Sequence, residues 1–284
     1  MRFISLILLY ILPKPIFGQV EFRGRVVDSS GIGLQYVNIA LTNGRSGTIT
    51  DSAGFFDLPG VFENDTIQIS HIGYITRVMP VRLLHLNEIV VLSVLHSSLG
   101  EVEIRNWNTY RTLIKHGFSS YKSNGYIGLV SGSQLAVFIK NPENREGWIK
   151  RIYIPIYRTT PCADLFRVRV LIGDEIIGPS KVIYFSEKPI LAKQINKAIW
   201  IDVSESRVLF PKEGCFIAFE VLSESFGCDI SLQTAISSTM AHPSIVTWSN
   251  YRDLRWTKSQ RILYNQKTLT PRMSIEVGYT KKNL

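Results

Sequence analysis

The chain has 284 residues, of which 45% are hydrophobic and 19% are charged, and its formal net charge is +9. This length exceeds what one small β-sandwich needs and predicts two domains. Past the first 18 residues, no apolar run reaches the roughly eighteen residues of a spanning helix, which excludes an integral helical membrane protein. The positive charge is spread thinly, so it indicates a solvated surface more than an anionic partner such as lipopolysaccharide or an acidic glycan.

The first 18 residues have the pattern of a secretory signal peptide. Arg2 precedes an apolar run at residues 3–12, and Pro13 and Pro15 then interrupt any helix. The run is too short to cross a bilayer, and we expect cleavage after Gly18 rather than retention as an anchor. This predicts export to the periplasm, the outer-membrane surface or the exterior, where nucleic acid is a disfavoured partner.

Residues 19–97 are predicted to form a small antiparallel sandwich of seven strands. Runs of β-branched and aromatic residues alternate with period two, and turn signals such as Asn43-Gly44 and Ser52-Ala53-Gly54 separate them. The predicted strands cover residues 26–27, 36–41, 47–50, 55–58, 65–70, 78–81 and 88–92.

The motifs of this segment are G-x-V-x-D from Gly24, G-x-x-L-x-x-V-N-I around Asn38, G-T-x-T-D-x-x-G-x-F from Gly47, and D-x-I-x-I-S-x-I-G-Y through Ser70. Their order resembles the carboxypeptidase regulatory-like (CarboxypepD_reg-like) domain of exported Bacteroidetes proteins. The resemblance implies a transthyretin-like Greek-key sandwich. It also implies an accessory role, because this module accompanies the catalytic domain of certain carboxypeptidases and begins many TonB-dependent receptors.

A zinc site is not predicted in this domain. His85 and Glu88 give the one H-x-x-E spacing, but they lie at a turn that leads into a β-run. A solvated turn therefore explains the pair better than a metal site, and we expect no metal and no other cofactor.

Residues 98–122 are predicted to connect the two domains. The polar and aromatic stretch that begins at Arg105 is compatible with a short helix running to His116.

Residues 123–284 are predicted to form a second, jelly-roll-like sandwich, which makes the whole protein all-β. The likeness to galactose-binding-like jelly rolls concerns shape alone. Eight strand-like runs support this fold, at residues 126–130, 134–139, 147–157, 165–171, 181–185, 198–203, 215–222 and 273–279.

Aromatic residues are the candidates for stacking on sugar rings. Trp248, Tyr251, Arg252 and Trp256 lie in one polar, aromatic and cationic segment, which we predict to be a surface loop and a candidate ligand site. We favour the interpretation that the two tryptophans anchor a long loop against the sandwich. Trp107 is a further candidate, whereas Trp148 and Trp200 alternate with apolar neighbours and are predicted to be core.

The three cysteines are Cys162, Cys215 and Cys228. Export permits one disulfide, and Cys215 could pair with Cys228 across a short loop. Cys215 also lies inside an apolar run, so it could be a core residue, and we favour no disulfide.

No catalytic residues are predicted. Four acidic residues, Asp202, Glu205, Glu220 and Asp253, could meet in space as a hydrolase pair, but no local arrangement favours this. The sequence therefore predicts a non-enzymatic cell-envelope protein that combines a scaffold with a binding module for a glycan or an outer-membrane protein. The alternatives are a carbohydrate or peptide hydrolase with a site assembled from distant loops, and an accessory protein of a TonB-dependent transport system.

Overall fold

The computed structural model describes residues 20–84, 88–95, 113–119, 122, 125–159, 165–192, 198–222, 229–238, 247–259, 262–263 and 267–279. Nearly all regular structure in these residues is β-strand, as predicted. Two short 3₁₀ turns, η1 (Val81–Leu83) and η2 (Ser204–Ser206), interrupt the strands. Among the residues described, no helix is long and apolar enough to cross a membrane.

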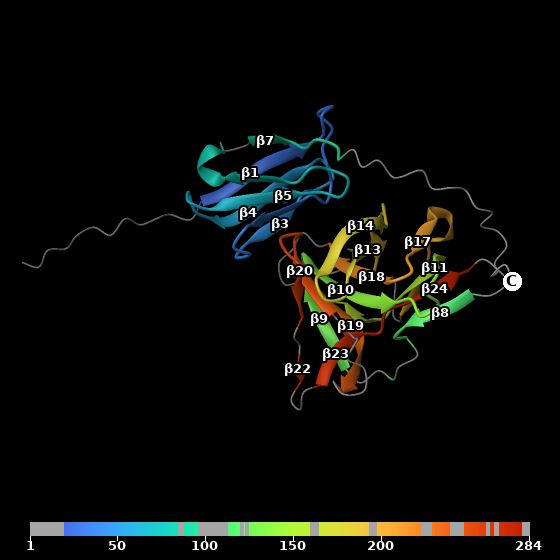
Figure 1. The fold of residues 1–284 in the computed structure, drawn as a ribbon. Coiled ribbons are helices and arrows are strands. Elements are labelled where there is room, and N and C mark those ends of the chain that lie inside the picture. Colours follow the sequence, from blue (N-terminus) through green and yellow to red (C-terminus); the bar gives the residue numbers. More distant parts are fainter. Residues whose placement is uncertain are drawn as a thin grey trace, which may run out of the picture.

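The N-terminal domain is a two-layer sandwich of seven strands (Figure 1). One sheet has the order β4-β1-β7 and the other the order β3-β2-β5-β6. Strand β7 runs parallel to β1, and the other pairs are antiparallel. Each predicted strand overlaps an observed one: β1 (Val20–Val27), β2 (Asn38–Leu41), β3 (Gly47–Ile49), β4 (Phe55–Val61), β5 (Thr66–Ser70), β6 (Arg77–Pro80) and β7 (Glu88–Val91).

The alternation of side chains sets the core of this domain. On β4, Phe56 and Leu58 are buried while Phe55 and Asp57 between them are exposed. The inward side chains join those of the second sheet in one apolar cluster of twelve buried residues. The period-two pattern of the sequence therefore becomes the division between core and surface.

The turns of the N-terminal domain are held by aspartates. Asp28 Oδ1 accepts hydrogen bonds from the backbone N–H of Ser30 and Ile32, at 2.8 and 2.9 Å. Asp51 Oδ1 does the same for Ala53 and Phe55, at 2.9 and 2.8 Å. Such side-chain to backbone bonds are the reason that Asp-rich turn signals mark strand ends.

The C-terminal domain is a larger sandwich in which three sheets surround one core. Its strands are β8 (Leu113–Gly117), β9 (Gly125–Val130), β10 (Ser133–Lys140), β11 (Gly147–Ile154), β12 (Ile156–Thr159), β13 (Leu165–Asp174), β14 (Gly178–Phe185), β15 (Ile190–Leu191), β16 (Ile199–Asp202), β17 (Val208–Phe210), β18 (Gly214–Val221), β19 (Asp229–Ser238), β20 (Thr247–Tyr251), β21 (Thr257–Lys258), β22 (Ile262–Leu263), β23 (Lys267–Pro271) and β24 (Ser274–Gly278).

A seven-stranded sheet forms one layer, with the order β14-β13-β18-β10-β20-β21 and β15 paired to β13. Two five-stranded sheets form the other layer. One has the order β16-β11-β24-β8 with β17 on β11, and the other has the order β12-β19-β23-β22 with β9 on β19. The chain joins them directly, because β11 and β12 are separated by Pro155 alone.

The main core of this domain lies between the two layers. On β10, Leu135, Val137 and Ile139 face it, together with alternate residues of β13 and β18. The intervening residues of these strands must point to the opposite, outer face of the seven-stranded sheet. This outer face is where the N-terminal domain packs.

The predicted helix ending at His116 is wrong over its last residues, because Leu113–Gly117 form strand β8. Strand β8 pairs antiparallel with β24, with Lys115 opposite Glu276. Backbone hydrogen bonds to a strand far away in sequence override the local propensity. The C-terminal sheet thus begins inside the segment predicted to be a linker, and residues 98–112 lie outside the described part.

Several strands of the C-terminal domain had no prediction, most notably β19 and β20. Both are rich in Ser, Thr, Gln and Asn, which weakens the apolar signal of a strand. The eight predicted runs all overlap observed strands.

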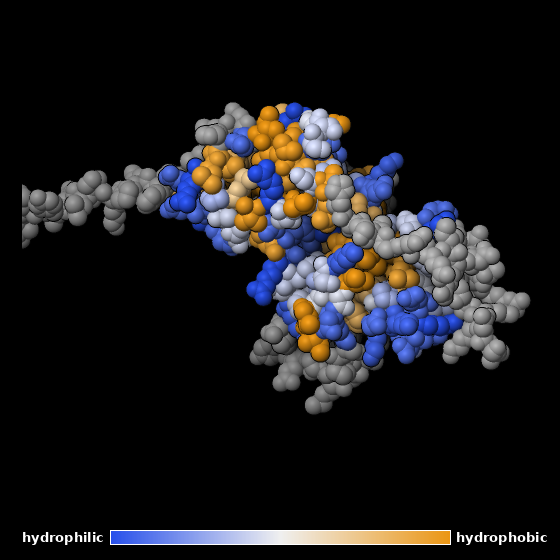
Figure 2. Space-filling model, turned by 45° about the horizontal axis from the view of Figure 1, so that its top comes forward, coloured by the Kyte–Doolittle hydropathy of each residue, from blue (hydrophilic) through white to orange (hydrophobic). Residues whose placement is uncertain are grey.

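Apolar side chains also gather on the outward face of the N-terminal domain (Figure 2). Phe55 on β4 is 54% exposed, and Ile89 and Val91 on β7 are 60% and 42% exposed. These residues belong to the sheet β4-β1-β7, whereas the hydrogen bonds to the C-terminal domain described below come from the other sheet.

Candidate functional site

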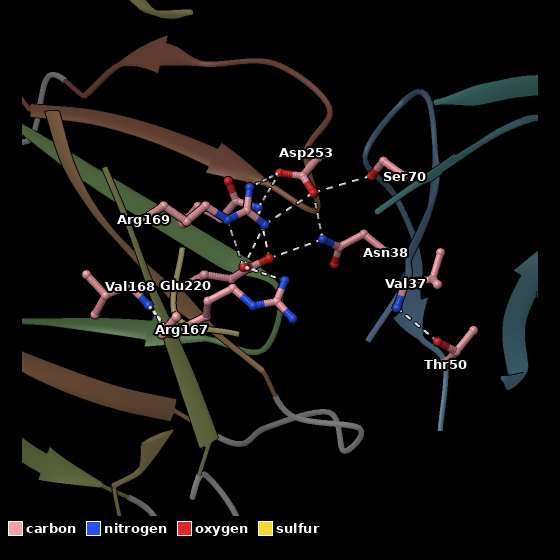
Figure 3. Close-up of polar contacts among 11 residues, drawn as sticks. Val37, Asn38, Thr50, Ser70, Arg167, Val168, Arg169, Glu220 and Asp253 are labelled. Atoms are coloured by element: carbon pink, nitrogen blue, oxygen red, sulfur yellow. Dashed lines mark hydrogen bonds and ion pairs between the residues drawn. The ribbon is translucent and has the colours of Figure 1, made fainter. Parts of the chain in front are cut away.

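The two domains meet where β2 and β5 of the N-terminal domain face the turn that follows β20. Seven side chains form a polar group there, which we call the interdomain cluster (Figure 3). Its members are Asn38, Ser70, Gln134, Arg167, Arg169, Glu220 and Asp253.

The strands bring the charged residues together on the outer face of the seven-stranded sheet. Glu220 of β18 lies opposite Gln134 of β10 on one side and opposite Arg167 of β13 on the other. Arg169 follows two residues later on the same face of β13. Arg167, Arg169 and Glu220 are almost fully buried, at 4%, 3% and 1% exposure.

Arg169 is the centre of the cluster. Its Nη2 lies 2.6 Å from Oε2 of Glu220, and its Nη1 lies 2.7 Å from Oδ1 of Asp253. Arg167 Nη1 lies 3.6 Å from the same oxygen of Glu220. Two buried guanidinium groups thus face two carboxylates, and their formal charges balance.

The ionisation of the cluster follows from these contacts. Burial alone raises the pKa of Asp253, but the charge and hydrogen bonds of Arg169, with hydrogen bonds from Gln134 and Asn38, outweigh it and lower the pKa to about 2. Burial likewise lowers the pKa of Arg169, and the charges of Asp253 and Glu220 outweigh this and raise it. Asp253 and Arg169 are therefore charged at any physiological pH.

Hydrogen bonds cross from the N-terminal domain into this group. Asn38 Nδ2 donates to Oε1 of Glu220 at 3.1 Å and to Oδ2 of Asp253 at 2.8 Å. Ser70 Oγ donates to Oδ2 of Asp253 at 3.3 Å, and Gln68 Nε2 donates to the Asp253 carbonyl oxygen at 2.8 Å. The N-terminal domain thus supplies donors to acceptors of the C-terminal domain.

The turn after β20 presents Asp253 to the other domain. Arg252 and Asp253 both have positive φ, of 46° and 61°. The Arg252 side chain turns back over the sheet, where its Nη2 donates to Ser131 Oγ at 3.1 Å. A Cβ atom at Gly47 would lie 2.4 Å from Arg252 Cδ, so a glycine at this position of β3 lets the two domains approach closely.

His71, next to Ser70, lies beside the cluster as a neutral base. Burial lowers its pKa, the positive charge of Arg167 lowers it further, and the pKa falls to about 4. A proton on His71 would place a third positive charge near the two arginines.

A cleft of about 910 Å³ opens beside the cluster, between the two domains. Residues around Ser70–Tyr74 form one wall, and β14 forms the other. Arg169 and Asp253 lie in its lining.

The structure differs from the predicted surface loop at Trp248, Tyr251, Arg252 and Trp256. Residues Thr247–Tyr251 form strand β20, which pairs with β10. Trp248 and Arg252 are buried, at 7% and 4% exposure, and Tyr251 and Trp256 are half-buried. Trp248 packs with Phe138 and Phe216, and Trp256 packs against that group, which matches the anchoring interpretation.

The predicted core positions of Trp148 and Trp200 are also wrong. Both are half-buried and lie outside the apolar clusters, since Ile149 and Ile152 of β11 take the inward places. The Trp200 ring lies 5.1 Å from that of Tyr153, and the Arg151 guanidinium lies 5.2 Å from the Trp200 centroid. The tryptophans do alternate with isoleucines along the strands, as predicted, but they occupy the outward-facing positions.

The four candidate carboxylates divide into two pairs. Glu220 and Asp253 meet through Arg169, whereas Asp202 and Glu205 are exposed on and after β16. Hydrogen bonds from Ser204 lower the pKa of Asp202.

Several of the other candidate residues lie outside the part of the chain that the structure describes. His85, Trp107, Cys162 and Cys228 lie outside the described residues, and Glu88 lies on β7. Within the described residues, no group of three His, Cys, Asp or Glu side chains could hold a metal ion. Cys215 is a free, fully buried thiol of the main core, which confirms its assignment as a core residue.

Prediction from sequence missed the arginines of the cluster. Their signal was the alternation Arg167-Val168-Arg169-Val170, which places two charges on one face of a strand whose other face is apolar. Such a face needs either solvent or a polar partner.

The fold and the cluster define a protein of two β-sandwiches joined through a charged contact. Residues 22–104 match the family model described as the CarboxypepD_reg-like domain, which is a transthyretin-like β-sandwich. Asn38 and Ser70, which contact the cluster, belong to motifs of this matched segment.

No curated protein matches the sequence. Two crystal structures of BcpA, the major pilin subunit of Bacillus cereus, one of them a single-residue variant, are similar at 7% and 10% identity. Each alignment covers 89% of this chain and 69% of the pilin chain, with a TM-score of 0.19, which is too low to indicate a shared fold or function.

Proposed function

We propose that this is an exported, non-catalytic protein of the Bacteroidetes cell envelope, in which the N-terminal domain is held in a fixed orientation on a C-terminal binding domain. The interdomain cluster is the observation that carries this proposal. It joins the domains through hydrogen bonds from Asn38 and Ser70 to a balanced set of buried charges.

The same cluster argues against hydrolysis at the one place where candidate carboxylates meet. A glycosidase needs one carboxylic acid with a raised pKa to protonate the leaving group. Asp253 has its pKa lowered to about 2, and both Asp253 and Glu220 are hydrogen-bonded to Arg169. These carboxylates act as structural partners of the arginine.

Export rests on the sequence of residues 1–18, and the Bacteroidetes assignment rests on the motifs that match the CarboxypepD_reg-like model. Expression of the full chain with cell fractionation and N-terminal sequencing tests this part. We expect the protein outside the cytoplasm, beginning at Gln19.

The non-catalytic part is tested with a broad panel of ester, glycosidic and peptide substrates. We expect no turnover by the purified protein. Turnover of any substrate would overturn the non-catalytic part of the proposal, and its loss in Glu220→Gln with the fold retained would assign the catalytic role to the cluster.

A second candidate function is docking to a protein of an outer-membrane transport system. The outward sheet β4-β1-β7 favours it, because Phe55, Ile89 and Val91 are exposed on β4 and β7, the two strands that flank β1. A hollow of about 650 Å³ lies on this face and is bordered by Arg25, Phe55 and Ile89. Exposed apolar groups of this kind mark protein contacts.

A photo-crosslinking residue at Ile89 tests this docking in cells, with Ile32 as the control position. Ile32 is 64% exposed in the turn that follows β1, but it does not border the hollow. We expect an adduct to one transport protein from position 89 alone. Equal adducts from both positions, or none, would contradict docking through this sheet.

A further inference from the structure

The interdomain cleft has the size and position of a ligand site. Its volume of about 910 Å³ lies within the roughly 300–1,000 Å³ of small-molecule sites, which occur preferentially between domains. The cluster beside it fixes both walls, since Ser70 and Asp253 belong to the cluster and also line the cleft. The cleft is thus a feature of the assembled protein and of neither domain alone.

The charges of the lining indicate a neutral ligand. Arg169 and Asp253 are paired with each other at 2.7 Å. The other charged side chains of the lining are Lys181 and Glu187, which have opposite signs. His71 is neutral above a pH of about 4. Neither an anion nor a cation would therefore find an excess of opposite charge.

The remaining polar groups are hydroxyls next to aromatic rings. Tyr74 and Tyr184 are both half-buried in the lining, and the Tyr74 ring lies 5.2 Å from that of His71 at an angle of 67°. Ser180 Oγ donates to the carbonyl oxygen of Ile172 at 2.9 Å, and Ser206 is hydrogen-bonded to the Tyr184 hydroxyl, so both serine oxygens keep lone pairs that can accept from a ligand. A ligand with an apolar ring face and many hydroxyl groups fits such a lining.

We propose that the cleft binds a short neutral saccharide, which contacts both domains. This proposal rests on the proposed function, because it names the ligand of the binding protein. The cleft shares Asp253 with the segment around Trp248, but none of the aromatic side chains of that segment lines it.

An extended peptide is a less suitable occupant. Strand β14 is the edge of its sheet along the cleft, and a peptide would have to add to this edge as a further strand. The pairing of β14 with β13 is irregular at two places, and Pro179 lies within the strand. Irregularities and prolines of this kind prevent strand addition at edges.

The test is a glycan array with the full chain, followed by calorimetric titration of the best neutral oligosaccharide. Tyr74→Ala is expected to weaken binding by about tenfold or more. Tyr184→Phe removes a single hydroxyl, which is also hydrogen-bonded to Ser206, and is expected to weaken binding with only a small fall in melting temperature. Tyr126→Ala is the control, because Tyr126 is 61% exposed on β9 and does not line the cleft.

The other possible results distinguish the saccharide site in the cleft from the proposed function as a whole. Glycan binding that is lost in Tyr126→Ala and retained in both cleft variants would overturn the cleft site but leave a binding protein. Binding of peptides without any glycan would overturn the saccharide. The absence of glycan binding from a protein whose domains are firmly coupled would also overturn it, while the scaffold function would stand.

Discussion

Asn38 of the N-terminal domain donates a hydrogen bond of 2.8 Å to Asp253 of the C-terminal domain. The same amide nitrogen donates to Glu220 at 3.1 Å, so both of its hydrogens are used by carboxylates of the other domain. A charge-assisted hydrogen bond is roughly twice as strong as a neutral one. The Asn38 side chain therefore contributes two charge-assisted hydrogen bonds to the contact between the two domains.

Asp253→Asn is expected to destabilise the C-terminal domain by about 3 kcal/mol, because it leaves Arg169 buried with one partner fewer. Urea unfolding followed by tryptophan fluorescence measures this, since all five tryptophans lie at or beyond residue 107 and none lies in the N-terminal domain.

Glu143→Gln is the matched control for this measurement, because it lies in the same domain as the tryptophans. Glu143 pairs with Arg145 at 3.4 Å near the surface, where a pair contributes roughly 0–1 kcal/mol. Equal effects of the two substitutions would show that the interdomain cluster has no special energetic role.

Stability is expected to fall in two steps as the pH is lowered. The pKa of His71 is lowered from 6.5 to about 4 in the folded protein, so the unfolded chain takes up its proton first and stability declines between pH 6.5 and 4. The pKa of Asp253 is lowered from 3.8 to about 2, so its contribution is present above pH 3.8 and is lost as the pH falls toward 2.

Two variants separate these steps. His71→Gln should flatten the pH dependence between 6.5 and 4, and Asp253→Asn should flatten it below 4. Unfolding titrations at a series of pH values measure both. A His71→Gln profile that coincides with the original one would rule out the first assignment.

Gly47→Ala is expected to loosen the contact between the domains, because the added methyl group would lie 2.4 Å from Arg252 Cδ. Scanning calorimetry should then show separate transitions for the two domains, while the N-terminal strands persist. Thr48→Ala, one position further along β3, is the control and should keep the original profile.

Cys215 is expected to be inert in the folded protein, because burial raises the pKa of its thiol and its side chain has no exposed surface. The variant Cys162→Ser/Cys228→Ser leaves Cys215 as the one thiol to titrate. An aromatic disulfide reagent should label it in denaturant and not in native buffer. Rapid labelling of the native variant would contradict its placement in the core.

The N-terminal domain could be predicted from sequence because its turns carry their own chemistry, as at Asp28 and Asp51. Strand β20 could not, because Thr247, Ser249 and Asn250 interrupt any apolar alternation. The pairing of Asn38 with Glu220 was equally hidden, because it joins residues 182 positions apart and depends on how two complete domains meet. Local patterns specify strands, whereas the candidate site arises from their assembly.

The polar character of the contact also limits which module can precede the C-terminal sandwich. A foreign module with an aliphatic side chain in place of Asn38 would deprive Glu220 and Asp253 of one hydrogen-bond donor each. The free energy lost with these hydrogen bonds would exceed that gained by burying the apolar side chain. The charged face of β13 and β18 is therefore a contact surface that is selective for polar partners. It favours a module that presents a hydrogen-bond donor at the position of Asn38 over a sandwich with an aliphatic side chain there.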